Sequence, residues 1–224
     1  GFAQRCRSCT SWGREPGRTL AFEFSDGKLM YCSVSQLAEF SPADLERRLA
    51  DGAYARACAG AQLIAITNWT LYPHMTACWR LLRERVYARL AHRPRFFFDL
   101  VDPTARTADD VRAMLAEMRA FTAHGTVALG VNLNEANVLA RVLGLPTVPG
   151  EDGPAVAAQA LRLRETLGID EVATHCVKLA AQADASGAVW AAGPFCAAPK
   201  KSVGAGDRFN AGHNAASLLG LPPL

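Results

Sequence analysis

The sequence lacks any apolar run long enough to cross a membrane, and it carries little excess charge of either sign. A transmembrane helix needs about 20 predominantly apolar residues, so we expect no membrane partner. The formal net charge is only +3 and the basic residues are scattered. Nucleic-acid binding needs a concentrated basic surface, so we expect no nucleic-acid partner either. The sequence also contains no internal repeat and no low-complexity segment.

The cysteines do not form a pattern that predicts disulfides or a complete metal site. There are seven of them, an odd number, at irregular spacing. Cys6-x-x-Cys9 could be half of a zinc site, but no second pair with suitable spacing follows. Reduced thiols in a cytoplasmic protein explain these cysteines better. We therefore expect a cytoplasmic location.

The length of 224 residues, with 50% hydrophobic composition, is enough for one good core and suggests one domain. Residues 1–18 show no hydrophobic period and remain unassigned. Residues 19–24 and 28–34 are two short strand-like runs separated by a turn that contains Asp26-Gly27. This pattern predicts a β-hairpin.

From Ser41-Pro42 onward, helical segments alternate with short apolar runs. Ser, Pro and a following acid are typical of a helix start. Strands are expected at 62–67, 96–101, 126–131, 172–177 and 188–192, and helices at 75–90, after Thr107, at 135–143 and at 154–167. This alternation predicts an α/β fold with a largely parallel sheet and right-handed crossovers. Ligands of such sheets bind beyond the carboxyl ends of the strands.

The most informative stretch is Gly204, Ala205, Gly206 and Asp207, followed by residues at roughly helical spacing. Small residues let a ligand approach the backbone closely. The N–H groups at the start of a helix, together with the helix dipole, favour an anion. An acid at this place would repel the anion, but it makes sense as a base that takes a proton from a group attacking that anion. The alternative is a glycine-rich helix start with Asp207 as an ordinary first-turn charge.

The order G-A-G-D-x-F-N-A-G at residues 204–212 resembles the second motif of the PfkB, or ribokinase-like, sugar kinases. The resemblance implies that Gly204, Ala205 and Gly206 form an anion hole for the transferred phosphoryl group, and that Asp207 is the catalytic base. It also implies a three-layer αβα sandwich with a mostly parallel sheet, in which the hairpin belongs to a lid or an edge. We accordingly assign residues 19–224 to a ribokinase-like domain. Family members carry further segments at both ends, so we expect this domain to be incomplete.

A second motif, N-x-x-E at Asn132 and Glu135, follows the strand expected at 126–131. It resembles the family motif that organises magnesium and the phosphates of ATP, usually through water. Mg²⁺ retains most of its waters in proteins, so an amide and a carboxylate that hold those waters suffice. Taken alone, the same spacing is also that of a helix cap.

Two further stretches resemble nucleotide-binding segments of the family. Asp102-Pro103-Thr104-x-Arg106 resembles D-x-N-x-R, with Thr104 where Asn is usual, and Arg106 could neutralise phosphate charge. The alternative is that Asp102-Pro103 is a turn and Arg106 faces solvent. Thr174 aligns with a threonine that touches nucleotide phosphate in relatives.

These observations together predict ATP- and Mg²⁺-dependent phosphorylation of a hydroxyl group on a sugar or sugar-like molecule, and a homodimer is one possible assembly. The first alternative is a non-catalytic nucleotide- or sugar-binding module with the same fold. A Rossmann-type oxidoreductase is disfavoured because the third glycine of G-x-G-x-x-G is absent and the motif lies near the C-terminus. His213-Asn214 has no explanation at this stage, because the helix that carries it is expected to pack inward through apolar residues.

Overall fold

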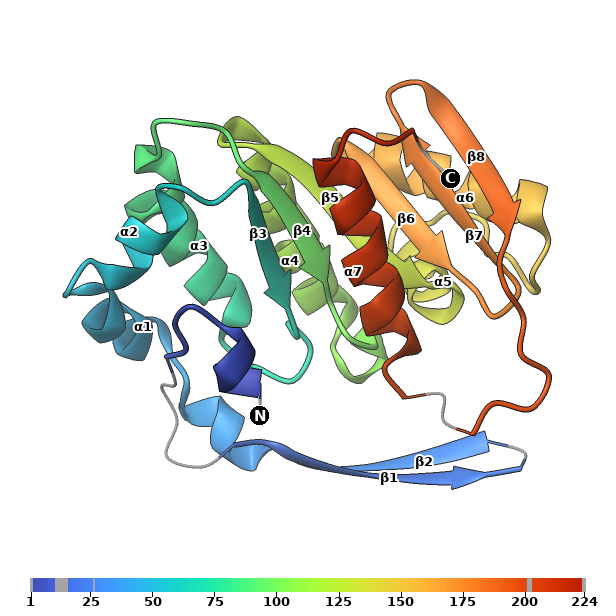
Figure 1. The fold of residues 1–224 in the computed structure, drawn as a ribbon, viewed down its shortest axis with the longest axis horizontal. Coiled ribbons are helices and arrows are strands. Elements are labelled where there is room, and N and C mark those ends of the chain that lie inside the picture. The colour runs from blue at the N-terminus through green and yellow to red at the C-terminus, as the bar shows by residue number, and fades with distance from the viewer. Residues whose placement is uncertain (1, 11–15, 26, 201–202, 223–224) are drawn as a thin grey trace.

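A computed structural model of the chain describes residues 2–10, 16–25, 27–200 and 203–222 (Figure 1). Its strands form a two-stranded hairpin and a six-stranded sheet with the order β3-β4-β5-β6-β7-β8. Strands β3 to β6 are parallel, whereas β7 and β8 continue the sheet in antiparallel fashion. The strands are β1 (Arg18–Phe24), β2 (Gly27–Ser33), β3 (Leu63–Thr67), β4 (Arg95–Asp99), β5 (Thr126–Asn132), β6 (Glu171–His175), β7 (Leu179–Asp184) and β8 (Gly187–Ala192).

The helices alternate with the parallel strands as the sequence predicts. They are α1 (Pro42–Leu49), α2 (Ala53–Cys58), α3 (Met75–Arg85), α4 (Ala108–Ala120), α5 (Leu133–Val142), α6 (Gly153–Leu167) and α7 (Ala205–Leu218), with short 3₁₀ turns η1 (Phe2–Arg5), η2 (Ser35–Glu39), η3 (Tyr87–Arg89), η4 (Pro103–Ala105) and η5 (Phe121–Ala123). Ser41 and Thr107 cap α1 and α4 through their side chains, which confirms both expected helix starts. The helix expected at 75–90 is shorter, because α3 ends at Arg85 and a 3₁₀ turn follows.

The main core lies on one face of the sheet, beneath α3, α4, α5 and α6. Apolar residues of β4 and β5 such as Phe96, Phe98 and Leu129 are fully buried there, together with Trp79 of α3 and Met118 of α4. Helix α7 crosses the opposite face in front of β5 and β6 (Figure 1). The expected three-layer α/β arrangement is therefore confirmed, with α7 forming the third layer in the described chain.

The expected hairpin is present as β1 and β2, and it lies below the carboxyl ends of the parallel strands, close to the start of α7 (Figure 1). Asp26 of the predicted turn lies outside the described residues. The segment left unassigned in the sequence, 1–18, contains η1 and the first residue of β1. Within the described parts of the chain, no helix is long and apolar enough to span a bilayer.

Candidate functional site

The glycine stretch forms the start of α7. Gly204 has a φ of +87°, a left-handed conformation that glycine adopts without strain, and it is the residue just before the helix. The helix begins at Ala205. Asp207 is an exposed acid in the first turn. Because the first N–H groups of a helix have no intrahelical acceptor, they are available to an anion here.

The start of α7 lies over the carboxyl ends of the central strands. Asp99, Asn132 and His175 are the last residues of β4, β5 and β6, and Asn132 pairs in register with His175. Gly206 packs on the His175 ring so closely that a Cβ atom at residue 206 would lie 3.1 Å from two ring atoms. The sheet therefore brings its polar strand ends to the backbone of the helix start, as the α/β fold predicts for a ligand site.

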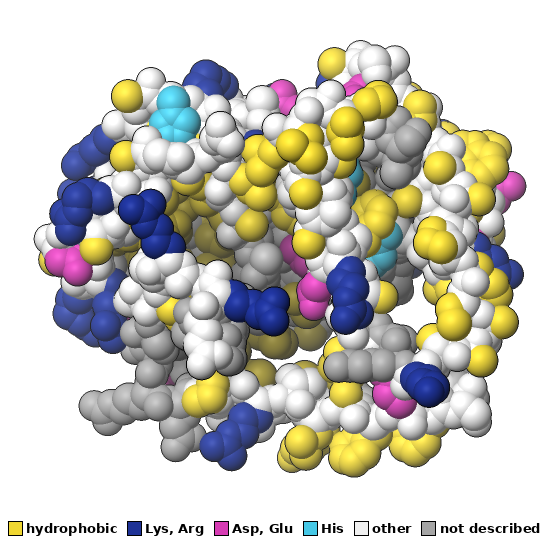
Figure 2. All heavy atoms as spheres, in the orientation of Figure 1, with side chains coloured by type: hydrophobic (Ala, Val, Ile, Leu, Met, Phe, Trp, Pro, Cys, Tyr) yellow, Lys and Arg dark blue, Asp and Glu magenta, His cyan; other side chains and the backbone are white. Residues whose placement is uncertain are grey.

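A cavity of about 690 Å³ joins these elements. Its lining includes the predicted residues Asn132, Glu135, Gly204, Ala205, Gly206 and Asp207, together with Asp99 and His175. Figure 2 shows this face of the molecule, which is hollowed between α7 and the hairpin and carries acidic side chains beside the lower part of α7. The N-x-x-E stretch and Asp207 thus line one cavity.

The cavity is strongly acidic. Four carboxylates line it, and among the described lining residues there is no Lys or Arg. One of the four, Glu151, is already engaged, because its two oxygens accept the N–H groups of Val177 and Lys178 at 2.7 and 3.0 Å. The others are Asp99, Glu135 and Asp207. A phosphate group could enter such a cavity only with a cation and with the N–H groups of α7.

Asn132 and Glu135 form a capping box at the start of α5. The Glu135 N–H group donates to Asn132 Oδ1 and the Asn132 N–H group donates to a Glu135 carboxylate oxygen, both at 2.9 Å. Burial raises the pKa of Glu135 to about 7; the hydrogen bonds from Asn132 partly oppose this, and the charges of Asp99 and Asp102 add to it. The cap alternative is thus correct for the local structure, and the same two residues line the cavity.

The donor set fits a hydrated Mg²⁺ ion. Glu135 lines the cavity, and the negative charges of Asp99 and Asp102 near it favour a cation. In the described ranges, no group of three or more His, Cys, Asp or Glu side chains could coordinate a metal ion directly. Binding through water, which Mg²⁺ prefers, is what this arrangement can support. Within the described residues, Cys6 and Cys9 belong to no such group of metal-ligating side chains.

Asp102 and Arg106 do not line the cavity. Asp102 caps η4 by accepting the Thr104 N–H group at 2.9 Å, so the expected turn is present. Arg106 does not face solvent: its guanidinium lies 4.2 Å from the Trp69 ring centroid, and its side chain is 13% exposed. It also donates to the carbonyl oxygens of Thr70, Tyr72 and Pro73. The Arg106 side chain therefore binds the connection between β3 and α3.

Thr174 is also absent from the cavity lining. It is fully buried, and it alternates along β6 with His175, so the two side chains lie on opposite faces of the sheet. Its hydroxyl has no hydrogen-bond partner within the described residues.

Sequence reasoning did not single out Asp99 or His175. Burial lowers the pKa of the His175 imidazole, although the charges of Asp99 and Asp207 oppose this. Both His175 and Cys176 line the cavity. Burial and the charge of Glu151 raise the pKa of the Cys176 thiol to about 11, so a nucleophilic thiolate is disfavoured. The strand expected at 96–101 did not end at Asp99, and only the structure makes Asp99 the last residue of β4.

Known proteins resemble the chain at the level of family and fold. Residues 3–223 match the family model described as prokaryotic ketohexokinase. A ketohexokinase of Haloferax volcanii is 30% identical over 207 residues, which cover 92% of this chain and 54% of that protein. The chain thus spans about half the length of the curated relative it matches.

Two solved structures share the fold. The crystal structure of a PfkB protein from Polaromonas sp. JS666 matches with a TM-score of 0.59 and 18% identity over 97% of this chain and 65% of that one. The apo form of a putative ribokinase II from E. coli matches with a TM-score of 0.56 and 17% identity over 92% and 59%. The structures support the fold alone, whereas the family model spans nearly all of the sequence. The chain belongs to the prokaryotic ketohexokinase family, which confirms the resemblance to PfkB-like carbohydrate kinases.

Proposed function

We propose that the whole protein transfers the γ-phosphoryl group of ATP to a hydroxyl group of a ketohexose. One observation carries this proposal: the Asp207 carboxylate, the N–H groups at the start of α7 and the Asn132–Glu135 pair line one cavity at the carboxyl ends of the strands. The sugar class follows from the family and from the name of the Haloferax relative. A base, an anion site and a metal site within one cavity are the parts that phosphoryl transfer requires.

In this proposal Asp207 is the general base. Its side chain is exposed and lies in the first turn of α7, so a sugar hydroxyl can reach it and lose its proton to it. The N–H groups that follow Gly204 would stabilise the negative charge that develops on the transferred group. Because these donors belong to a helix backbone, they require no reorganisation during the reaction.

Asn132 and Glu135 would hold Mg²⁺ through water, and the ion would supply positive charge opposite the phosphates. This role is supported by the acidic lining, which has no Lys or Arg among its described members. Asp102 would act only through its charge, since it raises the pKa of Glu135 without lining the cavity. We assign Arg106 and Thr174 to the fold rather than to ATP.

The hairpin has a face suited to a second copy of the chain. Leu20, Phe22, Leu29 and Tyr31 lie opposite one another across β1 and β2, and all four are exposed. Glu23, on the other face, accepts the N–H group of Val203 at 3.4 Å, so the apolar face points away from α7. An isolated two-stranded hairpin is marginally stable, and pairing of two apolar faces would stabilise it. Light scattering of the wild type and of Phe22→Ser should therefore show loss of a dimer in the variant.

An assay of ATP consumption with ketoses, aldoses and nucleosides tests the proposed reaction on the whole protein. We expect ketohexose-dependent formation of ADP and of a sugar phosphate. Binding of ATP and sugar without turnover would favour the binding-module alternative instead. A requirement for a nicotinamide cofactor would favour the oxidoreductase.

A further inference from the structure

Helix α7 is attached to the sheet by polar side chains. Its buried residues are Asn210 and Asn214, and neither apolar cluster of the described chain contains an α7 residue. Gly130 of β5 leaves room for the helix, because a Cβ atom there would lie 2.4 Å from Phe97 Cζ and 2.8 Å from Asn210 Oδ1. The helix therefore approaches the sheet closely, and both of its buried residues make hydrogen bonds to side chains of β4.

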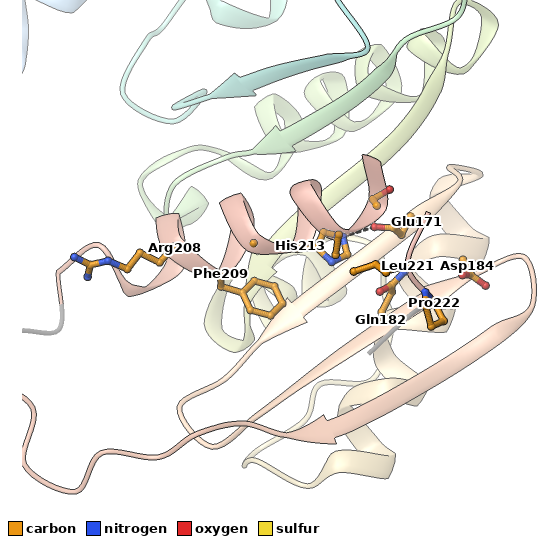
Figure 3. Close-up of a pocket in the computed structure, with 11 residues that line it drawn as sticks. Glu171, Gln182, Asp184, Arg208, Phe209, His213, Leu221 and Pro222 are labelled. Atoms are coloured by element: carbon orange, nitrogen blue, oxygen red, sulfur yellow. Dashed lines mark hydrogen bonds and ion pairs between the residues drawn. The ribbon is translucent and has the colours of Figure 1, made fainter. Parts of the chain in front are cut away.

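The first anchor lies toward the amino ends of the strands (Figure 3). His213 Nε2 donates to Glu171 Oε1 at 2.5 Å, as Figure 3 shows. The two guanidinium NH₂ groups of Arg95 donate to the same carboxylate at 2.7 and 3.2 Å. Arg95 Nε also donates to Asn214 Oδ1 at 3.3 Å. The His213 and Glu171 side chains are only 7% and 9% exposed. Although burial opposes ionisation, the bonds from His213 and Arg95 hold the pKa of Glu171 below its usual value.

The second anchor lies at the carboxyl ends, beside the acidic cavity. Asn210 Nδ2 donates to Asp99 Oδ2 at 2.9 Å, and the other Asp99 oxygen accepts the N–H group of Val101 at 3.2 Å. Asn210 lies three residues before His213 and three after Asp207, about one helical turn in each direction. The two anchors thus hold neighbouring turns of α7, and the catalytic end of the helix begins one turn beyond.

Polar anchoring has a consequence that apolar packing does not have. Apolar burial is non-directional, so it specifies the rotation and height of a helix only through the shapes of the packed side chains. A buried hydrogen bond is directional, and breaking it leaves an unpaired polar group at a cost. Two such anchors one turn apart fix both the rotation of α7 and its height on the sheet. Buried polar groups that set the register of a helix are known from other systems.

We propose that Asn210 and His213 are positioning residues, whose bonds to Asp99 and Glu171 place Asp207 and the first N–H groups of α7 over the ends of β4, β5 and β6. This inference rests on the proposed function for its kinetic consequence, but the attachment of α7 can be measured without any activity. It also explains His213-Asn214, the polar pair for which the sequence offered no account. The pair faces the sheet because its partners there are charged.

The test compares His213→Leu, which removes the donor, with His213→Gln, whose amide can donate from a similar position. We expect amide hydrogen exchange in α7 to become about tenfold faster in the Leu variant, with β4 and β5 unchanged and the Gln variant close to wild type. In turnover assays kcat should fall about 10- to 100-fold in the Leu variant while the sugar KM stays within about twofold, since displacement by about 1 Å has effects of this size. Leu218→Ala, an exposed change on the same helix, is the matched control.

Unchanged amide hydrogen exchange in α7 of the Leu variant would overturn the inference, and so would an unchanged kcat. Equal effects of the Leu and Gln substitutions on exchange and kcat would also overturn it. An equal effect in the two variants would mean that ring packing of His213 on Phe97 of β4, 6.4 Å away between centroids, holds the helix instead. If the wild type turns over no sugar, the proposed function fails, and the exchange comparison alone then decides whether the bond holds α7. Should His213→Leu not fold, His213→Met against His213→Gln gives the same comparison.

Discussion

Glu135 should make the stability of the metal-free protein depend on pH near neutrality. The residue is 6% exposed, and burial, followed by the charges of Asp99 and Asp102, raises the pKa of its carboxyl group from 4.5 to about 7. In the unfolded chain the same group has an ordinary pKa. The folded protein therefore holds a proton on Glu135 over a pH range in which the unfolded chain has already lost it.

The sign and size of the effect follow from this difference. A raised pKa in the folded state contributes stability that is fully present below the unfolded pKa of 4.5 and is lost as the pH rises through about 7. The whole change corresponds to ~3 kcal/mol as an order-of-magnitude figure. Glu135→Gln keeps a similar shape but cannot ionise, so this part of the pH dependence should disappear in the variant.

The assay is urea unfolding of both proteins with EDTA at several pH values between 4.5 and 8. We expect the free energy of unfolding of the wild type to fall relative to Glu135→Gln as the pH rises. Added Mg²⁺ should reverse the trend above about pH 7, because metal binding requires the ionised carboxylate. If the free energies of unfolding of the two proteins changed in parallel with pH in the absence of metal, the reasoning would be refuted.

Two further predictions concern side chains outside the proposed chemistry. Gly212→Ala should raise the free energy of unfolding by about 0.5–1 kcal/mol, because Gly212 lies inside α7 with open space around its missing Cβ atom; a lower midpoint in urea would contradict this. Arg106→Ala should lower stability by about 2 kcal/mol through loss of the Trp69 contact and the carbonyl bonds. The Kd of this variant for MgATP, measured by calorimetry, should stay within about twofold of the wild-type value. A Kd about tenfold higher would indicate that Arg106 does bind the nucleotide.

Local sequence signals predicted the parts of this structure that depend on local physics. The small residues before Asp207 predicted a turn at a helix start, and the structure has it, with Gly204 in the left-handed conformation. The spacing of Asn132 and Glu135 predicted both a cap and a place at a strand end, and both are present. Such features need only neighbouring residues and the direction of the chain.

The missed features depend on contacts between distant residues. Glu171, the partner of His213, is 42 positions away, and Arg95 is 119 positions from Asn214. Hydrophobic periodicity assumes that buried helix faces are apolar, and α7 breaks that assumption. The position of Arg106 likewise depends on the carbonyl groups of another connection, which its own motif does not reveal.

The most direct test of the proposed mechanism is turnover by Asp207→Asn in the whole protein. Asp207 lines the cavity as an exposed acid beside N–H groups that favour an anion, a place where a negative charge is otherwise unfavourable. The account predicts that kcat falls about 10²–10⁴-fold, the range for losing a positioned general base, while MgATP binds as well as before or slightly more tightly. A near-normal kcat would contradict it, because Asp207 would then be only a charge at the end of a helix.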